Sequence, residues 1–283
     1  MELTRQEIES AAADVVARAL VEDIGLGDLT SRALFGPEER CRAKVLLKEK
    51  GVVCGLAVAR AAFRRLDETI ELEPLVEDGA LVGEIPRELV RLTGHTRAIL
   101  GAERVALNLL GRLSGIATLT RAFVAAVEGT GAAILDTRKT TPGLRALEKY
   151  AVQVGGGVNH RIGLYDAVLV KDNHLRLAGG VEEAVRRLRS SVRLQLEVEA
   201  DTLEQVEQAL GLGVERILLD NMSPTEVAAA VGLVAARAQL EVSGGVTLEN
   251  VRAYAETGVN AISIGALTHS VRSLDVSLEV LEP

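Results

Sequence analysis

The sequence has few aromatic residues, few cysteines and no long unbroken apolar run, and each shortage excludes a class of protein. Aromatic residues make up 2% of the 283 residues and Trp is missing, so stacking platforms for nucleic-acid bases are not expected. Cys41 and Cys54 have the spacing of neither a zinc motif nor a redox pair, which favours a reduced, cytoplasmic protein. Without a run of about 18 apolar residues, we expect no membrane span. The opening stretch MELTRQEIESAAADVV also lacks the apolar core of a signal peptide.

The overall charge is negative, with a formal net charge of -8, which argues against a general nucleic-acid binder. The composition, 48% hydrophobic and 25% charged, is that of a soluble globular protein. The length fits one large domain, or a large domain with a smaller one.

The second half of the chain alternates short apolar strands with amphipathic helical stretches. We predict strands over 132–137, 166–172, 194–200, 216–221, 240–245 and 261–267. Asp201 with Glu204, and Ser223 and Pro224 with Glu226, indicate helix starts. Nearly continuous apolar strands are typical of parallel sheets buried on both faces, so a closed barrel and an open doubly wound sheet both fit. The chain has no dinucleotide-binding or Walker fingerprint, which disfavours the open sheet.

The first hundred residues follow a different pattern, which predicts a smaller α+β domain. We expect helices over about 4–21 and 56–66, and a hairpin in CRAKVLLKEKGVVCG that turns near Lys50 and Gly51. A long helical stretch, 98–129, leads into the second half. We place the N-terminal domain at 1–105, with the tail 270–283 packing on it, and the catalytic domain at 106–269.

Polar residues follow every predicted strand of the second half, at the point where the strand ends. In a β/α barrel all these ends lie on one face, and that face holds the active site. Polar loops are ordinary at single strand ends, but six in succession favour a common pocket. The residues at these six ends are Asp136, Arg138, Lys139, Lys171, Asp172, Asn173, His174, Glu197, Glu199, Asp220, Asn221, Ser243, Gly244, Gly245 and Gly265.

A basic set predicts an anionic ligand, although a solvated charged surface is the usual reading of such residues. Its members lie beside apolar runs and glycines: Arg138, Lys139, His160, Arg161 and Lys171. A charge pair at about 4 Å contributes about 4 kcal/mol at an effective dielectric near 20. Several such pairs overcome the repulsion between a net-negative protein and a dianion. Since no second histidine has ligand spacing, we expect His160 to donate a hydrogen bond to the anion.

Two carboxylates form the acidic counterpart, Glu199 and Asp220. They are either partners of the nearby cations or ligands of magnesium and the ribose hydroxyls that stabilise a developing positive carbon. Glu197 has the same strand parity as Glu199, so either side chain fits the pocket. The glycine turns at 243–245 and 264–267 follow the last two strands, where barrels often bind phosphate.

These segments closely resemble the quinolinate phosphoribosyltransferase (nicotinate-nucleotide pyrophosphorylase, carboxylating) family. The resemblance is strong over 95–270 and looser before it, and it rests on GAERVALNLLGRLSGIAT, LDTRKTTPGLR, GGGVNHRIGLYDAVLVKDNH, EVE, LLDNM, VSGGV and IGALTHS. It implies an N-terminal α/β sandwich domain and an incomplete α/β barrel of about seven strands. It also implies that quinolinate and phosphoribosyl pyrophosphate give nicotinate mononucleotide, pyrophosphate and CO2, with magnesium, in de novo NAD synthesis.

The resemblance further implies residue roles and a homodimer or higher even oligomer in which Arg104 reaches the neighbouring site. Mg²⁺ is expected on the substrate pyrophosphate, with Glu199 and Asp220 as candidate ligands. The catalytic set is Lys139, Lys171, Glu199 and Asp220. The substrate-binding set is Arg104, Thr137, Arg138, Lys139, His160, Arg161, Lys171, Glu199, Asp220, Ser243, Gly244, Gly245 and Gly265.

Three other functions compete with this interpretation. A related phosphoribosyltransferase would use a different acceptor. A barrel aldolase would form a Schiff base on Lys171, but the basic set and the glycine turns argue against it. A non-catalytic anion-binding protein would not need both carboxylates beside all the cations.

Overall fold

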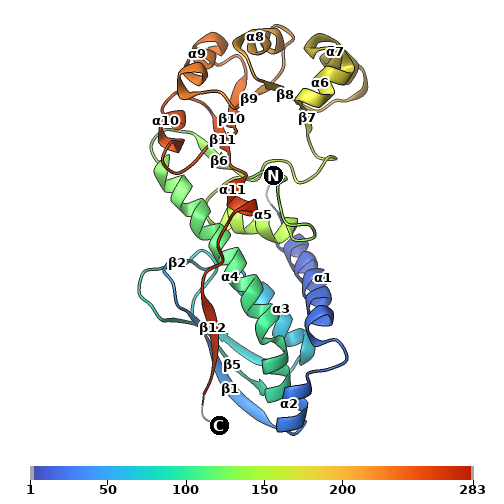
Figure 1. Cartoon of the computed structure of the whole chain (residues 1–283), viewed down its shortest axis with the longest axis vertical. Helices are drawn as coiled ribbons and strands as arrows, with labels where there is room; N and C mark the ends of the chain where they lie inside the picture. Colours follow the sequence, from blue (N-terminus) through green and yellow to red (C-terminus); the bar gives the residue numbers. More distant parts are fainter. Residues whose placement is uncertain (1–2, 282–283) are drawn as a thin grey trace. The chain divides into compact units, whose positions relative to one another are not determined.

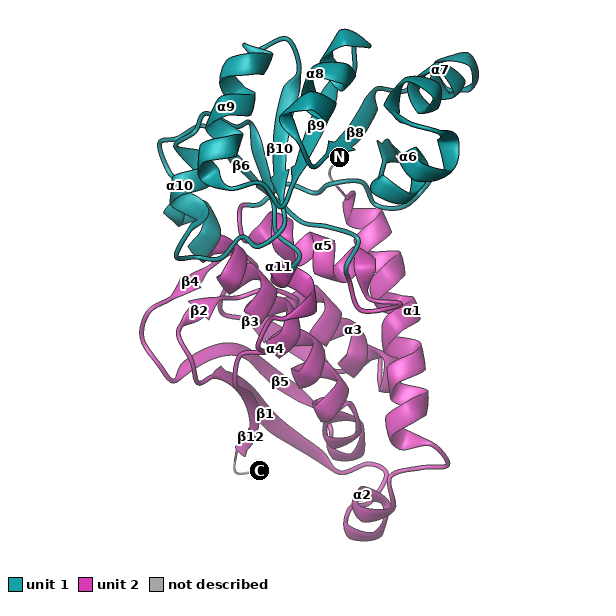
Figure 2. Cartoon of the chain, turned by 45° about the horizontal axis from the view of Figure 1, so that its top comes forward, with its two compact units in different colours: residues 1, 122–139, 157–265 teal, residues 2–121, 140–156, 266–283 magenta. Residues whose placement is uncertain are grey.

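The computed structural model describes residues 3–281, which divide into two compact units (Figures 1 and 2). We call residues 122–139 and 157–265 the barrel unit, and the rest of the described chain the N-terminal unit. Residues 140–156 and the chain from 266 onward belong to the N-terminal unit. The two units are therefore interleaved in sequence, whereas we predict an N-terminal domain at 1–105 with the tail 270–283 packing on it, and an uninterrupted catalytic domain at 106–269.

The barrel unit contains six parallel strands in the spatial order β6-β11-β10-β9-β8-β7. All six lie within or one residue beside the predicted ranges: β6 Ala133–Leu135, β7 Val168–Val170, β8 Leu196–Ala200, β9 Arg216–Asp220, β10 Gln239–Ser243 and β11 Ala261–Ser263. Within residues 3–281, β6 and β7 are the sheet edges, so the barrel is incomplete. Beside β6, a seventh strand is represented only by the bridge between Leu135 and Val158.

Helices follow these strands and lie along one side of the sheet (Figure 2). They are α6 Asp172–Ala178, α7 Val181–Ser191, α8 Leu203–Gly211, α9 Pro224–Val234 and α10 Val251–Ala255. The predicted cap of α9 is confirmed, because Ser223 and Glu226 form a reciprocal capping box. The predicted cap of α8 is wrong by one residue: Thr202 accepts the hydrogen bond that caps this helix. The backbone N–H of Asp201 instead donates to Gln205 Oε1 at 2.6 Å.

The two faces of the parallel sheet differ in chemistry, because side chains alternate along each strand. The face with Val198, Ile217, Leu240 and Ile262 is apolar and fully buried. The strand register places Glu199, Leu218 and Glu241 in one row on the opposite face. Barrel interiors are usually filled by layers of branched apolar side chains. Here three buried glutamates, Glu197, Glu199 and Glu241, occupy that face.

The N-terminal unit contains an antiparallel sheet of order β12-β1-β5-β3 and a two-stranded pair, β2 and β4. The strands are β1 Arg40–Leu47, β2 Gly51–Val52, β3 Glu71–Pro74, β4 Leu81–Val82, β5 Arg87–His95 and β12 Val276–Leu281. The helices are α1 Arg5–Ile24, α2 Leu29–Leu34, α3 Leu56–Leu66, α5 Arg145–Val154, α11 Ala266–His269 and most of α4 Thr96–Ala126. The register of β12 on β1 runs from Val276 opposite Leu47 to Leu281 opposite Arg42.

The predicted hairpin around Lys50 and Gly51 is wrong. β1 pairs with β5 and β12, whereas the short β2 pairs with β4. The reason is a tertiary contact with α4, since Val52 N donates to Thr118 Oγ1 at 2.8 Å. A side chain at Gly51 would lie 2.6 Å from that hydroxyl, so the approach requires glycine.

Helix α4 has 31 residues and is long and apolar enough to cross a membrane by length and composition. Half of its most apolar window is buried inside the protein. Ile99, Leu110 and Ile116 are fully buried there. The hydropathy of α4 is thus that of a core helix.

Candidate active site

Hydrogen bonds join the carboxyl end of β6 to the segment that contains His160. Asp136, fully buried, accepts hydrogen bonds from Asn159 Nδ2 at 2.6 Å and from His160 N at 2.8 Å. Val158 N also donates to Ile134 O at 2.8 Å. These bonds bring two predicted motifs, LDTRK and VNHR, to the same end of the sheet.

Two arginines from these motifs lie close enough to act on each other electrostatically. Burial, and then the charge of Arg138, lower the pKa of Arg161. The Arg161 side chain is fixed from the protein side, because Nη1 donates to Ala167 O at 3.3 Å. Gathering two guanidinium groups in a partly buried place is unfavourable without an anion. The pair therefore suits a carboxylate or phosphate ligand.

Three carboxylates meet where β8 and β9 end, and we call Glu199, Asp201 and Asp220 the mouth cluster. One oxygen of each lies within 4.8 Å of the others. Burial, followed by Glu199 and Asp201, raises the pKa of Asp220, while Lys171 and Lys139 oppose that rise. Lys171 Nζ lies 3.4 Å from Glu199 Oε2. The predicted acidic pair and two of the predicted cations are thus brought together.

The mouth cluster also has the donor set that a hard divalent cation prefers. Mg²⁺ is usually held by one or two carboxylates plus substrate phosphates. The mutual repulsion that raises the pKa of Asp220 would be relieved by such a cation. The residues present therefore fit magnesium.

The glycine turn after β10 is packed against the end of β9. Asn221 N donates to Ser243 O at 2.8 Å, and Ser243 is the register partner of Asp220. Gly244 has φ +95°, and a Cβ there would overlap Asn221 Oδ1. Gly245 also has a positive φ, +64°. Only glycine meets both demands at 244.

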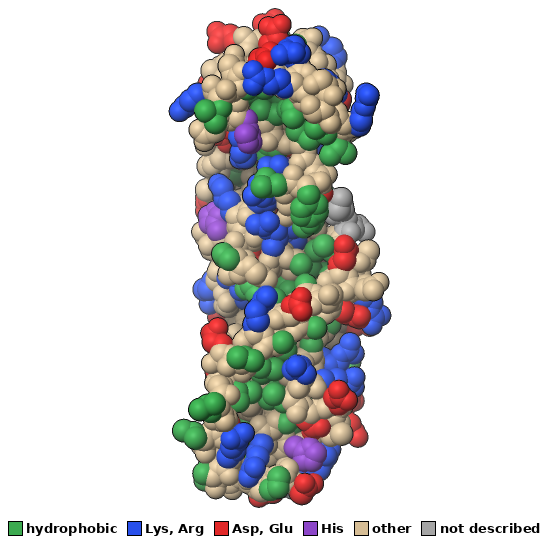
Figure 3. All heavy atoms as spheres, turned by 90° about the vertical axis from the view of Figure 1, so that its right-hand side faces the viewer, with side chains coloured by type: hydrophobic (Ala, Val, Ile, Leu, Met, Phe, Trp, Pro, Cys, Tyr) green, Lys and Arg blue, Asp and Glu red, His purple; other side chains and the backbone are tan. Residues whose placement is uncertain are grey.

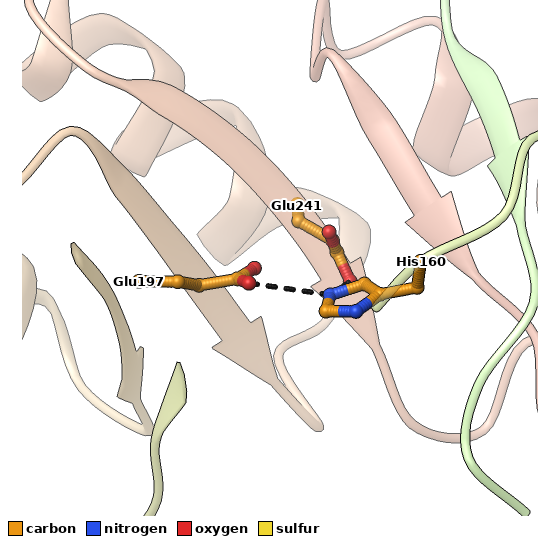
Figure 4. A group of neighbouring side chains, drawn as sticks. All are labelled: His160, Glu197 and Glu241. Carbon is orange, nitrogen blue, oxygen red and sulfur yellow. Dashed lines mark ion pairs between the residues drawn. The ribbon is translucent and has the colours of Figure 1, made fainter. Parts of the chain in front are cut away.

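A second group lies deeper in the barrel unit, and we call His160, Glu197 and Glu241 the inner cluster (Figure 4). His160 Nε2 lies 3.2 Å from Glu197 Oε2 and 3.3 Å from Glu241 Oε1. Burial lowers the pKa of His160, but the two carboxylates outweigh it and raise that pKa to about 9. Burial raises the pKa of Glu197. For Glu241 burial is opposed by His160 and Ser263, which hold its pKa below the usual value.

The predicted site residues do not all lie in one unit. Arg104 lies on α4 in the N-terminal unit, with a side chain 63% exposed and 3.7 Å from Glu103. The others belong to the barrel unit, in the loops or strand ends where the sequence analysis expects them: Thr137, Arg138, Lys139, His160, Arg161, Lys171, Glu199, Asp220, Ser243, Gly244, Gly245 and Gly265. The side chain of His160 points toward Glu197 on β8 and Glu241 on β10 (Figure 4).

Sequence reasoning missed two members of these groups. Glu241 precedes Ser243 by two positions, so strand parity puts both side chains on the inner face, a signal present in the sequence. Asp201 was interpreted as a helix cap, and no sequence signal separates that role from membership of the mouth cluster.

Comparisons with known proteins agree along almost the whole chain. The model of the quinolinate phosphoribosyl transferase N-terminal domain matches residues 28–114, and the model of its C-terminal domain matches 116–279. A Bacillus subtilis protein named probable nicotinate-nucleotide pyrophosphorylase (carboxylating) is 46% identical over 264 residues, 92% of this chain and 90% of the relative. A Mycobacterium leprae protein named nicotinate-nucleotide pyrophosphorylase (carboxylating) is 46% identical over 280 residues, 95% and 97% of the two chains.

A solved structure gives the same result for the fold. The nicotinate-nucleotide pyrophosphorylase from Francisella tularensis superimposes with a TM-score of 0.91 at 37% identity, covering 96% of this chain and 97% of the other. The predicted sandwich-plus-incomplete-barrel architecture is confirmed.

Proposed function

This chain belongs to the quinolinate phosphoribosyltransferase family, and from that premise we propose that it transfers phosphoribose from phosphoribosyl pyrophosphate to quinolinate. The products are nicotinate mononucleotide, pyrophosphate and CO2, a step of NAD synthesis. One observation carries the proposal: the barrel unit gathers paired arginines and lysine-flanked carboxylates at the carboxyl end of one parallel sheet. That arrangement suits a dicarboxylate and a polyanionic sugar donor together.

The first half of the reaction replaces pyrophosphate by the pyridine ring. Arg138 and Arg161 hold the two carboxylates of quinolinate, so that the ring nitrogen faces the anomeric carbon of the sugar. As the carbon–oxygen bond to pyrophosphate breaks, the sugar gains positive charge, which Glu199 and Asp220 stabilise. Lys171, 3.4 Å from Glu199, takes up the negative charge of the departing pyrophosphate.

The second half of the reaction is loss of CO2 from ring carbon C2. Bond formation makes the ring nitrogen positive, and this cation accepts the electron pair left when the C2 carboxylate leaves. The resulting ylide takes one proton at C2. Lys139 or a water molecule delivers it, so the decarboxylation requires no separate organic cofactor.

We assign magnesium to the mouth cluster together with the substrate pyrophosphate. Glu199 and Asp220 would hold the ion, and Asp201 completes the carboxylate set. Held there, the ion would supply positive charge against the leaving pyrophosphate. Removal of divalent cations with a chelator is expected to abolish product formation, and added Mg²⁺ to restore it.

We also propose a homodimer in which Arg104 completes the neighbouring site. Its side chain is exposed on α4 and contacts only Glu103 among the ion pairs of the described chain. The barrel unit exposes Leu164, Tyr165 and Leu177 near its β7 edge, which supports burial against another subunit. The face drawn in Figure 3 likewise mixes exposed hydrophobic with basic side chains.

Mixing two inactive variants tests the shared site. Arg104→Ala and Lys171→Ala are each expected to be inactive alone. After subunit exchange, a mixed dimer contains one intact site, so random pairing restores about a quarter of wild-type activity. If Arg104 acts within its own subunit, every site of the mixture keeps one lesion and no activity returns.

The same reasoning supports a cytoplasmic enzyme that binds neither nucleic acid nor membrane. Cys41 and Cys54 are both buried free thiols, which suits a reducing compartment. The net charge of -8 opposes binding to phosphate backbones.

The decisive experiment is incubation of the protein with quinolinate, phosphoribosyl pyrophosphate and Mg²⁺. Nicotinate mononucleotide and CO2 are expected in equal amounts, measured by chromatography and by release of label from the C2 carboxylate. Turnover of another pyridine or purine acceptor, with none of quinolinate, would establish the related phosphoribosyltransferase instead. Borohydride trapping of a carbonyl substrate on Lys171 would establish the aldolase.

A further inference from the structure

The imidazole of His160 contacts the protein through both ring nitrogens. Arg161 N donates to Nδ1 at 2.8 Å, and Nε2 lies between the carboxylates of Glu197 and Glu241. The backbone N–H of His160 is bound to Asp136 at 2.8 Å. Carboxylates only accept hydrogen bonds, so Nε2 carries a ring proton that faces them whether the imidazole is neutral or charged.

The two carboxylates come from different strands and are almost entirely buried. Glu197 extends from β8 with 7% of its side chain exposed, and Glu241 from β10 with 1% exposed. Glu241 also accepts a short hydrogen bond from Ser263 Oγ and lies 3.5 Å from Arg216 Nη1. Figure 4 shows the ring reaching from its loop to both strands. Burying a charged group costs free energy, so we expect two buried carboxylates around one histidine to serve a function.

A metal site is one reading of a histidine with two carboxylates, but the hydrogen bond at Nδ1 opposes it. Metal-bound histidines usually donate their other ring N–H to an acceptor. Here Nδ1 faces the backbone N–H of Arg161 and no acceptor, and the proton that faces the carboxylates lies on Nε2, the atom a metal would need. The contacts of His160 therefore fit an internal hydrogen-bonding centre.

The inner cluster continues into the arginine pair. Arg161 follows His160 directly, and its backbone N–H is one of the contacts that fix the ring. The charge of Glu197 also favours the charged form of Arg161, against the effect of Arg138. Glu197 thus contacts His160 and also acts electrostatically on Arg161.

We propose that Glu197 and Glu241 are positioning residues that hold the imidazole of His160 between β8 and β10 and thereby aim Arg161 at the carboxylates of quinolinate. This inference rests on the proposed function for its substrate. The two glutamates touch no substrate themselves; they fix the orientation of a segment that does.

The test compares Glu197→Gln with Glu183→Gln, a matched change on the exposed surface of α7, where Glu183 pairs with Arg186 and Arg187. Glu197→Gln is expected to raise the KM for quinolinate about 10- to 100-fold, with the KM for phosphoribosyl pyrophosphate changed less than about twofold. Glu183→Gln is expected to leave both values unchanged. Loss of kcat with both KM values preserved, as a smaller folded fraction produces, overturns the proposal.

A second measurement is independent of turnover and of the folding of any variant. Nitrogen-15 NMR of the wild-type protein with labelled histidine and arginine is expected to show His160 with a proton on Nε2 and slow exchange of that proton. Addition of quinolinate alone is expected to leave the Nε2 proton in place and to shift the guanidinium signals of Arg161. An unprotonated Nε2, or a metal bound to it in the purified protein, overturns the proposal.

The two failures are distinguishable. A wild-type protein that makes no nicotinate mononucleotide refutes the proposed function, while the nitrogen spectrum still decides how His160 is held. Normal turnover with an unchanged quinolinate KM in Glu197→Gln refutes the positioning role alone.

Discussion

The mouth cluster and the inner cluster are both built from carboxylates on the same face of one sheet, yet they differ in how their charge is balanced. Glu199 and Glu197 are two residues apart on β8. Glu197 faces His160, whereas Glu199 lies beside two further carboxylates and a single lysine within ion-pair distance. Two positions along β8 therefore separate a cluster whose negative charge is balanced by a histidine from a cluster whose negative charge is not fully balanced.

The pKa shifts of Glu241 and Asp220 reflect this difference, although burial raises the pKa of Glu197 in the inner cluster as well. In the inner cluster, His160 and Ser263 hold the pKa of Glu241 down. In the mouth cluster, burial and neighbouring carboxylates raise the pKa of Asp220. The carboxylates of the inner cluster are neutralised by the protein and stabilise its structure. The carboxylates of the mouth cluster repel one another and would be stabilised by a bound cation. The position of a glutamate along β8 therefore decides whether it stabilises the structure, as Glu197 does, or contributes to the mouth cluster, as Glu199 does.

The largest effect is expected on stability, from truncation in the inner cluster. Glu241→Ala leaves His160 and Arg216 without their shared buried carboxylate and is expected to lower the free energy of unfolding by about 3–5 kcal/mol. Urea denaturation measures this loss. Glu183→Ala, on an exposed ion pair, is the control and is expected to change it by about 0.5 kcal/mol or less. If both variants lose the same free energy of unfolding, the buried carboxylate of Glu241 stabilises the protein no more than an exposed one, which contradicts the prediction.

The next effect is on catalysis, from the mouth cluster. Asp220→Asn keeps the shape of the side chain but removes charge that stabilises the sugar cation, so kcat is expected to fall about 100- to 1,000-fold. Stability is expected to stay the same or to rise, because one of three repelling carboxylates is gone. Steady-state assays and urea denaturation of the same preparation measure both. If Asp220→Asn keeps its activity but loses stability, the mouth cluster is structural and not catalytic, which contradicts the prediction.

A smaller effect is expected on substrate binding, from the arginine pair. Arg138→Ala is expected to raise the KM for quinolinate about 30- to 100-fold, and the KM for phosphoribosyl pyrophosphate about threefold or less. Arg138→Lys keeps the charge without the planar fork and is expected to give an intermediate value. Equal increases in both KM values would show that Arg138 does not select the dicarboxylate.

The smallest effect is a dependence of stability on pH. Because the folded-state pKa of His160 is raised to about 9, its stabilising contribution is complete below its ordinary pKa of about 6.5 and is lost as the pH rises through about 9. Between pH 7 and about 9.5, the melting temperature of the wild type is expected to fall about 2–4 °C further than that of His160→Gln. Differential scanning calorimetry measures the difference, and parallel curves would contradict it.

The strands of the barrel could be predicted because each is indicated by a local sequence pattern that does not depend on distant residues. Each strand is a short apolar run before a polar strand end, so all six positions follow from periodicity alone. Ser223, Pro224 and Glu226 likewise form a cap with only their immediate neighbours. The residues at the mouth follow for the same reason, since parallel strands deliver their carboxyl ends to one edge.

The remaining features depend on contacts between distant residues. Gly51 and Val52 leave the expected hairpin because Thr118, far along the chain, binds this segment. Thr202 replaces Asp201 as a cap because both are good capping residues and only tertiary context separates them. His160 was predicted from its motif, but no local signal shows that its ring faces Glu197 and Glu241.

The pairing of β12 with β1 has a consequence for synthesis on the ribosome. Residues 276–281 supply one neighbour of β1, although β1 itself is made more than two hundred residues earlier. Until residues 276–281 have been synthesised, the outer edge of that strand has no partner from its own chain and is open to association with other nascent chains. Chains truncated before residue 276 are accordingly expected to aggregate, even though every catalytic residue named above is retained.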